Sequence, residues 1–95
     1  MATENTLTVN QKTVTAAGTA ELLITTDPAD YILIIKALST NTGLIYIGTS
    51  DVDSTNGFEL SAKEEHPIVI KEGQLSIYID SSVNGEGVCY DYYNV

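Results

Sequence analysis

The side chains that could do chemistry in this sequence are few and lie far apart along the chain. Nucleophilic catalysis needs a nucleophile, a base and a group that orients the base. The one histidine, His66, lies in a polar stretch before Pro67, so a surface loop histidine is the simpler interpretation. The one cysteine, Cys89, lies in a strand-like segment and is interpreted as a small buried hydrophobe. We therefore predict no catalytic residues and no enzymatic activity.

Two pairs of neighbouring carboxylates could carry out acid–base chemistry on a glycosidic bond. Asp51 and Asp53 form one pair, and Glu64 and Glu65 form the other. All four lie in polar segments, where acidic side chains are usually solvated. Solvated loop carboxylates are therefore favoured over catalytic ones.

The segment D-V-D-S-T-N-G, which begins at Asp51, resembles the opening of a calcium-binding loop. An EF-hand loop starting there needs glycine at its sixth position and glutamate at its twelfth, but Asn56 and Ala62 stand there. Asp51 and Asp53 thus remain weak calcium candidates beside the alternative of a turn that caps its own backbone. Zinc-ligand spacing and phosphate-binding glycine motifs are missing, so we predict no metal and no cofactor.

The chain is strongly acidic, with a formal net charge of −9 from thirteen acidic residues and four lysines. Such a surface repels phosphate backbones and anionic membranes, so we expect no nucleic-acid and no membrane partner. The charge is explained by solubility at high copy number, or by docking on a basic surface. The hydrophobic content of 43% is ordinary for a globular protein.

The location of the protein is also an expectation from sequence. One cysteine permits no intrachain disulfide, and the opening M-A-T-E-N-T shows no signal peptide. No apolar run approaches the roughly 20 residues of a membrane helix. We therefore expect folding in a reducing cytoplasm.

Short apolar runs bounded by turn residues recur along the chain, as is typical of β-strands. The most apolar run, Tyr31 to Leu38, is predicted to be a central strand buried on both faces. Asn56-Gly57 is predicted to be a turn that needs positive φ. The other expected strands span residues 21–25, 44–47, 58–62, 68–71, 74–80 and 88–94, with strand-like alternation near the start of the chain.

About eight strands with turns every 8–12 residues predict an all-β fold. We expect a single antiparallel β-sandwich of jelly-roll-like form, as one domain over residues 1–95. Residues 1–20 could form an edge strand or an arm that orders on a neighbouring molecule, and both interpretations stay open.

Tyrosines gather near the C-terminal end of the sequence. Tyr90 and Tyr92 share one face of the expected strand, while Tyr93 points to the other. Such a face can bind a sugar, contact a protein partner or pack at a sheet edge. The candidate interface residues are Leu7, Val9, Tyr46, Tyr90, Tyr92 and Tyr93.

The segment from residue 31 onward resembles the small all-β virion proteins of tailed bacteriophages. In that group an apolar strand ends in Y-x-G, a polar loop follows, and an N-G-hydrophobic-x-L strand returns. The features that carry the resemblance here are Asn41-Thr42-Gly43, Ile45-Tyr46-Ile47-Gly48, Asn56-Gly57-Phe58-Glu59-Leu60 and Ile77-Tyr78-Ile79.

The resemblance implies a structural virion protein, most simply a capsid decoration or head auxiliary protein, assembled in the host cytoplasm and carried in the virion. It implies jelly-roll architecture, a homotrimer, and capsid or other virion proteins as partners. The alternative is a receptor- or glycan-binding module of a tail or fibre.

Overall fold

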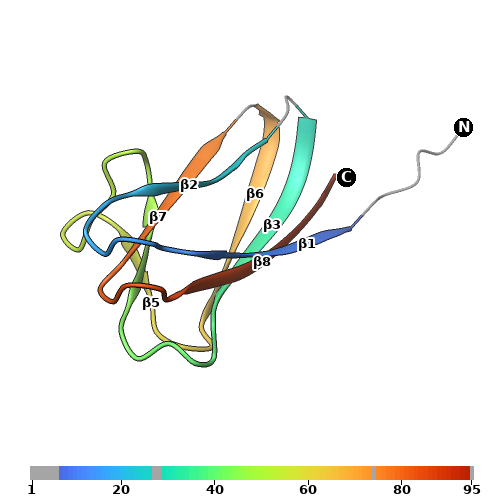
Figure 1. The fold of residues 1–95 in the computed structure, drawn as a ribbon. Helices are drawn as coiled ribbons and strands as arrows, with labels where there is room; N and C mark the ends of the chain where they lie inside the picture. The colour runs from blue at the N-terminus through green and yellow to red at the C-terminus, as the bar shows by residue number, and fades with distance from the viewer. Residues whose placement is uncertain (1–6, 27–28, 74, 95) are drawn as a thin grey trace, which may run out of the picture.

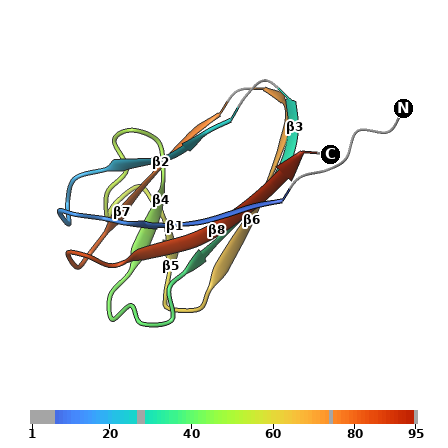
Figure 2. The same ribbon diagram turned by 45° about the vertical axis from the view of Figure 1, so that its right-hand side comes forward.

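The computed structural model describes residues 7–26, 29–73 and 75–94, which form two antiparallel sheets that face each other (Figures 1 and 2). Helices are absent from these ranges, and with them any helix long and apolar enough to cross a membrane. The prediction of an all-β fold is confirmed. The strands are β1 (Thr8–Thr13), β2 (Glu21–Thr25), β3 (Ala29–Ala37), β4 (Ile45–Gly48), β5 (Phe58–Leu60), β6 (Glu65–Gly73), β7 (Ser76–Ser81) and β8 (Gly87–Asn94).

The strand order is that of a jelly roll. One sheet has the order β1-β8-β3-β6, and the other has the order β2-β7-β4-β5. We call them the first and the second sheet. The first and last strands are neighbours, with Thr8 opposite Tyr92. Figure 1 shows blue β1 and red β8 running together along the margin of the first sheet. The predicted jelly-roll-like sandwich is confirmed.

The core lies between the two sheets because apolar side chains alternate along most strands. The first sheet contributes Leu33 and Ile35, and the second contributes Ile45 and Ile79, all four fully buried. Val14, just after β1, is also fully buried in this cluster. With Val88 in the same cluster, the core combines buried side chains from near both ends of the sequence.

The prediction that the segment 31–38 is buried on both faces is wrong. β3 is central in its sheet, between β8 and β6, but only alternate residues are buried. Leu33 and Ile35 face the core, whereas Ile32 and Ile34 point to the other side and are half-buried. A continuous apolar run indicates a strand, but it does not show whether a second layer covers its outer face.

The second sheet differs because a loop of the chain covers its outer side. Residues 49–57 connect β4 to β5 and fold back over Tyr46, which is 5% exposed. Val52 in this loop is buried too, at 3% exposed. A Cβ added at Gly57 would lie 2.6 Å from Cβ of Tyr46, so the loop backbone lies directly against the tyrosine.

The prediction of positive φ at Asn56-Gly57 is wrong. Positive φ occurs elsewhere in the described residues, at Gly18, Lys63 and Gly85. Close approach to Tyr46 is what requires glycine at position 57.

Residues 8–13 form an edge strand of the first sheet, which bears out that interpretation for this part of the N-terminal segment. An arm formed by residues 1–6 lies outside the described residues, as does the Asp27-Pro28 half of the predicted turn. Pro67 lies third in β6 rather than at its start.

Candidate interaction surface

The outer face of the first sheet carries an apolar surface that no layer of the described chain covers. Cross-strand register places its side chains in rows. Val9 and Val69 are 63% and 66% exposed at opposite margins of the sheet. We call this surface the outer patch: Val9, Ile32, Ile34, Pro67, Val69 and Tyr93. Exposed apolar surfaces of this kind mark contacts with other molecules.

The outer patch carries little net charge although the chain is strongly acidic. Asp91 lies within it, between Val9 and Ile34 in the same row. The next row pairs Lys36 with Glu65 across β3 and β6. These three charged residues sum to −1, against −9 for the chain. The acidic residues are therefore concentrated elsewhere, and this face can approach another surface without strong repulsion.

Three of the predicted interface residues are positioned for contact with another molecule. Leu7 is 59% exposed and Val9 is 63% exposed beside the β1 edge. Tyr93 points to the outer face, in one row with Ile32 and Val69. This placement follows from the side-chain alternation of strands, although the sequence alone did not show which face was uncovered.

The other three predicted interface residues lie elsewhere. Tyr46 lies under the 49–57 loop and is 5% exposed, so it adds almost no surface to a protein interface and we withdraw it from that set. Tyr90 and Tyr92 lie on the inner face, half-buried against the core cluster. Their rings are stacked with centroids 6.4 Å apart, and Tyr31 meets Tyr92 edge-on at 6.0 Å. These rings extend the core between the sheets.

Asp51 and Asp53, the weak calcium candidates, make hydrogen bonds within the 49–57 loop. Asp53 Oδ1 accepts hydrogen bonds from the backbone N–H and the hydroxyl of Thr55, which lower the pKa of this carboxyl. Asp51 Oδ1 accepts the Thr49 hydroxyl at 2.5 Å. Among the described residues, no three acidic, histidine or cysteine side chains cluster as metal ligands would. The Asp53 carboxylate thus caps the turn, and the Asp51 carboxylate binds the hydroxyl of Thr49 within the same loop.

The sequence-based candidates for catalysis are not brought together. His66 lies in β6 rather than in a loop, half-buried and stacked on Phe58 with ring centroids 4.0 Å apart. Cys89 is half-buried on β8, on the outer face of the first sheet. Glu64 accepts the Ser61 N–H at 2.7 Å and so closes a turn.

Two residues whose role the sequence analysis did not predict, Glu86 and Asn41, fix the loops at one end of the sandwich. Glu86 accepts N–H bonds from Thr42 and Gly43 at 2.7 and 2.9 Å, and these bonds lower the pKa of its carboxyl. Asn41 is buried, donates to the Gly87 carbonyl at 2.8 Å and accepts the Gly87 N–H at 3.3 Å. The Asn41-Thr42-Gly43 motif is therefore architectural. Its partners lie more than forty residues away, so no local pattern reveals them.

A hollow lies on the outer side of the second sheet. It has a volume of about 420 Å³ and is lined by Tyr46, Asp53, Ser54, Asp80 and Ser81, among others. Asp80 is 2% exposed, and its Oδ1 accepts the N–H groups of Gly18 and Ser81. This carboxylate holds the 14–20 loop against β7.

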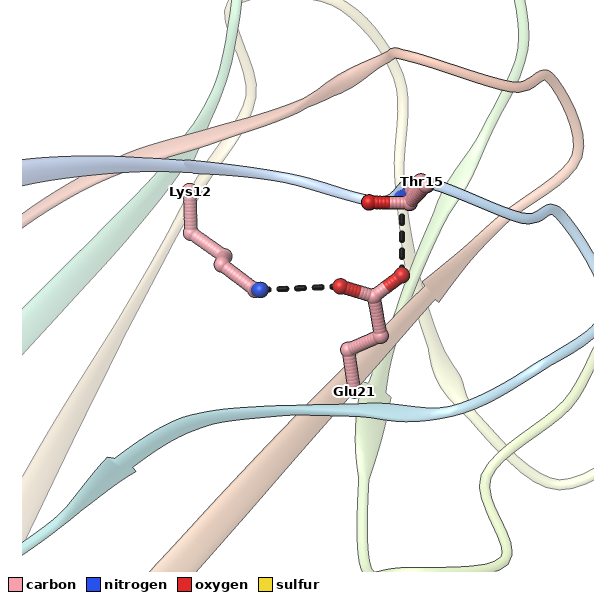
Figure 3. Close-up of polar contacts among 3 residues, drawn as sticks. All are labelled: Lys12, Thr15 and Glu21. Carbon is pink, nitrogen blue, oxygen red and sulfur yellow. Dashed lines mark hydrogen bonds and ion pairs between the residues drawn. The ribbon is translucent and has the colours of Figure 1, made fainter.

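One ion pair joins the two sheets beside the β1 edge. Lys12 Nζ lies 2.8 Å from Glu21 Oε1, and Glu21 Oε2 accepts the Thr15 N–H at 2.7 Å (Figure 3). The hydrogen bond from Lys12 is the main cause that lowers the pKa of Glu21, against a smaller opposing effect of burial. The one charged side chain of β1 is thereby engaged on its inner side.

Comparison with known proteins gives one informative likeness. No protein-family model matches the sequence, and no curated protein matches it. The fold is similar to a solved structure described as "Bacillus endospore appendages form a novel family of disulfide-linked pili", with a TM-score of 0.64 and 14% sequence identity. The match covers 97% of this chain and 87% of that one. At this identity the likeness supports the β-sandwich fold.

Proposed function

We propose that this protein is a structural subunit, which works by packing against copies of itself and against another protein of an assembled particle. The observation that carries the proposal is the outer patch, an apolar and nearly uncharged face on an otherwise acidic jelly roll. A face of this kind loses unfavourable contact with water when a partner covers it.

For the particle itself, we propose the virion of a tailed bacteriophage, with the chain as a capsid decoration or auxiliary protein. The support is the resemblance of residues 31–95, together with an acidic composition suited to solubility at high copy number. The partner is then a capsid or other virion protein with a neutral or basic docking site. The proposed location is the virion, after assembly in the host cytoplasm.

The similar appendage structure supports the same general role, because it belongs to a protein that its description calls a pilus. A disulfide-linked polymer needs at least two half-cystines in each subunit. The 95 residues contain one cysteine, Cys89, which could bond to only one neighbour. We therefore propose that this chain assembles through noncovalent contacts.

The test measures binding to intact particles. We expect the protein to copurify with tailed-phage virions, in a fixed ratio to the major capsid protein. We expect Val69→Asp to abolish rebinding to stripped capsids, because it places a charge in the outer patch. Leu22→Asp is the matched control, since Leu22 is 46% exposed on the second sheet. Equal loss of binding in both variants, or none in either, would contradict docking through the outer patch.

One observation favours the alternative of a glycan-binding tail or fibre module, namely the hollow between Asp53 and Asp80. Its carboxyl and hydroxyl groups match the hydroxyl groups of a sugar. If it binds glycans, Ser54→Trp should fill it and abolish any signal on a glycan array. Ser50→Trp, an exposed position in the same loop, should leave the signal intact. An empty array would remove this alternative.

A further inference from the structure

We propose that a second copy of this chain adds to the free edge of β1, so that two antiparallel β1 strands join the first sheets of two molecules. The pairing is a two-fold contact centred on Gln11. It deepens the structural role proposed above and rests on it.

Hydrogen bonds at the end of β1 show which of its backbone groups point outward. Val14 N–H donates to the Glu86 carbonyl at 2.9 Å, and the Val14 carbonyl accepts the Gly85 N–H at 2.7 Å. Val14 therefore holds a hydrogen-bonded position toward β8. Such positions alternate along an antiparallel pair. The N–H and C=O groups of Val9, Gln11 and Thr13 thus point away from β8, along the free edge.

The opposite edge of the first sheet is blocked. Ala37 N–H donates to the Glu64 carbonyl at 2.9 Å, and this fixes the same alternation along β6. Pro67 then falls on the outward-pointing row, and proline has no N–H to donate. Glu65 and Lys71 add charged side chains to that row. Proline and charge are the devices that prevent strand addition.

The edges of the second sheet are also poor templates. β5 has three residues, and β2 has a register shift between Leu22 and Ile24 that interrupts its row of groups. Among the described strands, β1 alone presents a regular edge of six residues without proline. Backbone pairing at such an edge is an established way of recruiting an extended strand.

A second copy fits this edge because the outward N–H and C=O groups of Val9, Gln11 and Thr13 can pair with the same groups of another chain. With Gln11 opposite Gln11, Val9 of each chain faces Thr13 of the other. All three outward residues of both strands then find antiparallel partners. The side chains at these positions are uncharged, and Lys12 is held by Glu21 on the inner side. Two chains of net charge −9 can therefore meet here without placing like charges in contact.

The contact would also cover exposed apolar surface. Val9 is 63% exposed at the β1 edge and continues the outer patch. Joining two first sheets would create one eight-stranded sheet with both outer patches on the same side. This contact gives a two-fold dimer, rather than the trimer that the sequence resemblance implies.

The first test removes one outward N–H from each edge of the sheet. Gln11→Pro deletes a donor that the chain itself does not use, and Val69→Pro does the same on β6. We expect wild-type protein to show a concentration-dependent dimer mass by light scattering. We expect Gln11→Pro to weaken dimerisation by about tenfold or more, because main-chain hydrogen bonds are lost. Val69→Pro should leave it unchanged.

The second test uses charge and keeps every backbone group. If Gln11 faces Gln11, then Gln11→Glu and Gln11→Lys should each weaken the dimer through like-charge repulsion. An equimolar mixture of the two variants should recover a heterodimer. A different partner surface would instead respond in opposite directions to the two charges.

The outcomes separate this inference from the proposed function. Dimers that persist in folded Gln11→Pro, or a charge mixture without recovery, would overturn pairing at β1 and leave the structural role standing. Wild-type protein that stays monomeric to high concentration yet binds capsids would do the same. Monomeric protein without any particle binding would overturn both.

Discussion

Lys63 and Gly85 both have a left-handed backbone conformation, with φ of 72° and 80°. They lie at equivalent positions in two corners of the chain that share one hydrogen-bonding pattern. In each corner, the glutamate that follows donates its N–H to the carbonyl two positions before the left-handed residue. The left-handed residue then donates its own N–H across to the opposing strand, to Ala37 in one case and to Val14 in the other. Each corner is thus a turn that leads into a β-bulge.

We predict that Lys63→Gly stabilises the protein, because a side chain at positive φ is strained and glycine is not. The expected gain is about 0.5–1 kcal/mol after the greater chain entropy of glycine is subtracted. This corresponds to a rise of a few degrees, up to about 8 °C, in Tm. Gly85→Ala is the mirror control and should lower Tm, although no atom lies within 4 Å of the added Cβ. A lower Tm for Lys63→Gly would show that the lysine side chain itself supports the corner.

We predict that the Lys12–Glu21 ion pair makes stability depend on pH in the acid range. Because the folded pKa of Glu21 is lowered, its contribution is fully present above the ordinary glutamate value of 4.5. It is lost as the pH falls through the folded pKa. Glu21→Gln should cost about 0.5–1 kcal/mol at neutral pH and almost nothing once the pH is below the folded pKa of Glu21. Urea unfolding across this range measures the difference, with Glu59→Gln as the control for an exposed charge. A constant difference at all pH values would contradict the ion-pair explanation.

We predict that Asn41→Ala is among the more damaging polar changes in the chain. It leaves the buried N–H of Gly87 without its partner, while the Gly87 carbonyl keeps the Leu38 N–H, at a cost of about 1–3 kcal/mol. Asn84→Ala removes an exposed bond to the Ala17 N–H and should cost less than about 1 kcal/mol. Denaturant midpoints of the two variants test the contrast, and similar losses would argue that Asn41 is not the bridge between these loops.

We predict that Gly87→Ala displaces β1. The added Cβ would lie 2.0 Å from the carbonyl oxygen of Lys12, a backbone atom that cannot rotate away. The expected loss is above about 2 kcal/mol, as for overpacking in a core. Gly18→Ala is the comparison, because its positive φ is strained but its surroundings are open, so about 1 kcal/mol is expected. Hydrogen exchange of β1 amides should accelerate in Gly87→Ala alone.

The sequence was sufficient for the strands because alternation and turn residues are local signals. Ile77 and Ile79 are inward-facing as their spacing predicts, and the segment 21–25 matches β2 without change. The jelly-roll order agrees with the expected class, but the pairing of β1 with β8 joins residues 74 to 84 positions apart. No local pattern encodes such a pairing.

The candidate surface was predictable only in part, for the same reason. Alternation places Tyr46 on the outer face of its strand, but the 49–57 loop closes over it. Alternation also places Ile34 on the outer face of its strand, but no loop of the described chain covers that face. Whether a face is covered depends on loop paths and sheet order, which one sequence does not specify.

The pairing of the first strand with the last has a consequence for biosynthesis. On the ribosome, Thr8–Thr13 emerges before Gly87–Asn94 and must wait for it before its ladder can form. Its backbone is therefore solvated on both sides until the later strand has been made. Such high contact order is associated with folding in milliseconds to seconds. During this time, the unpaired β1 strands of neighbouring nascent chains would be able to form wrong intermolecular ladders.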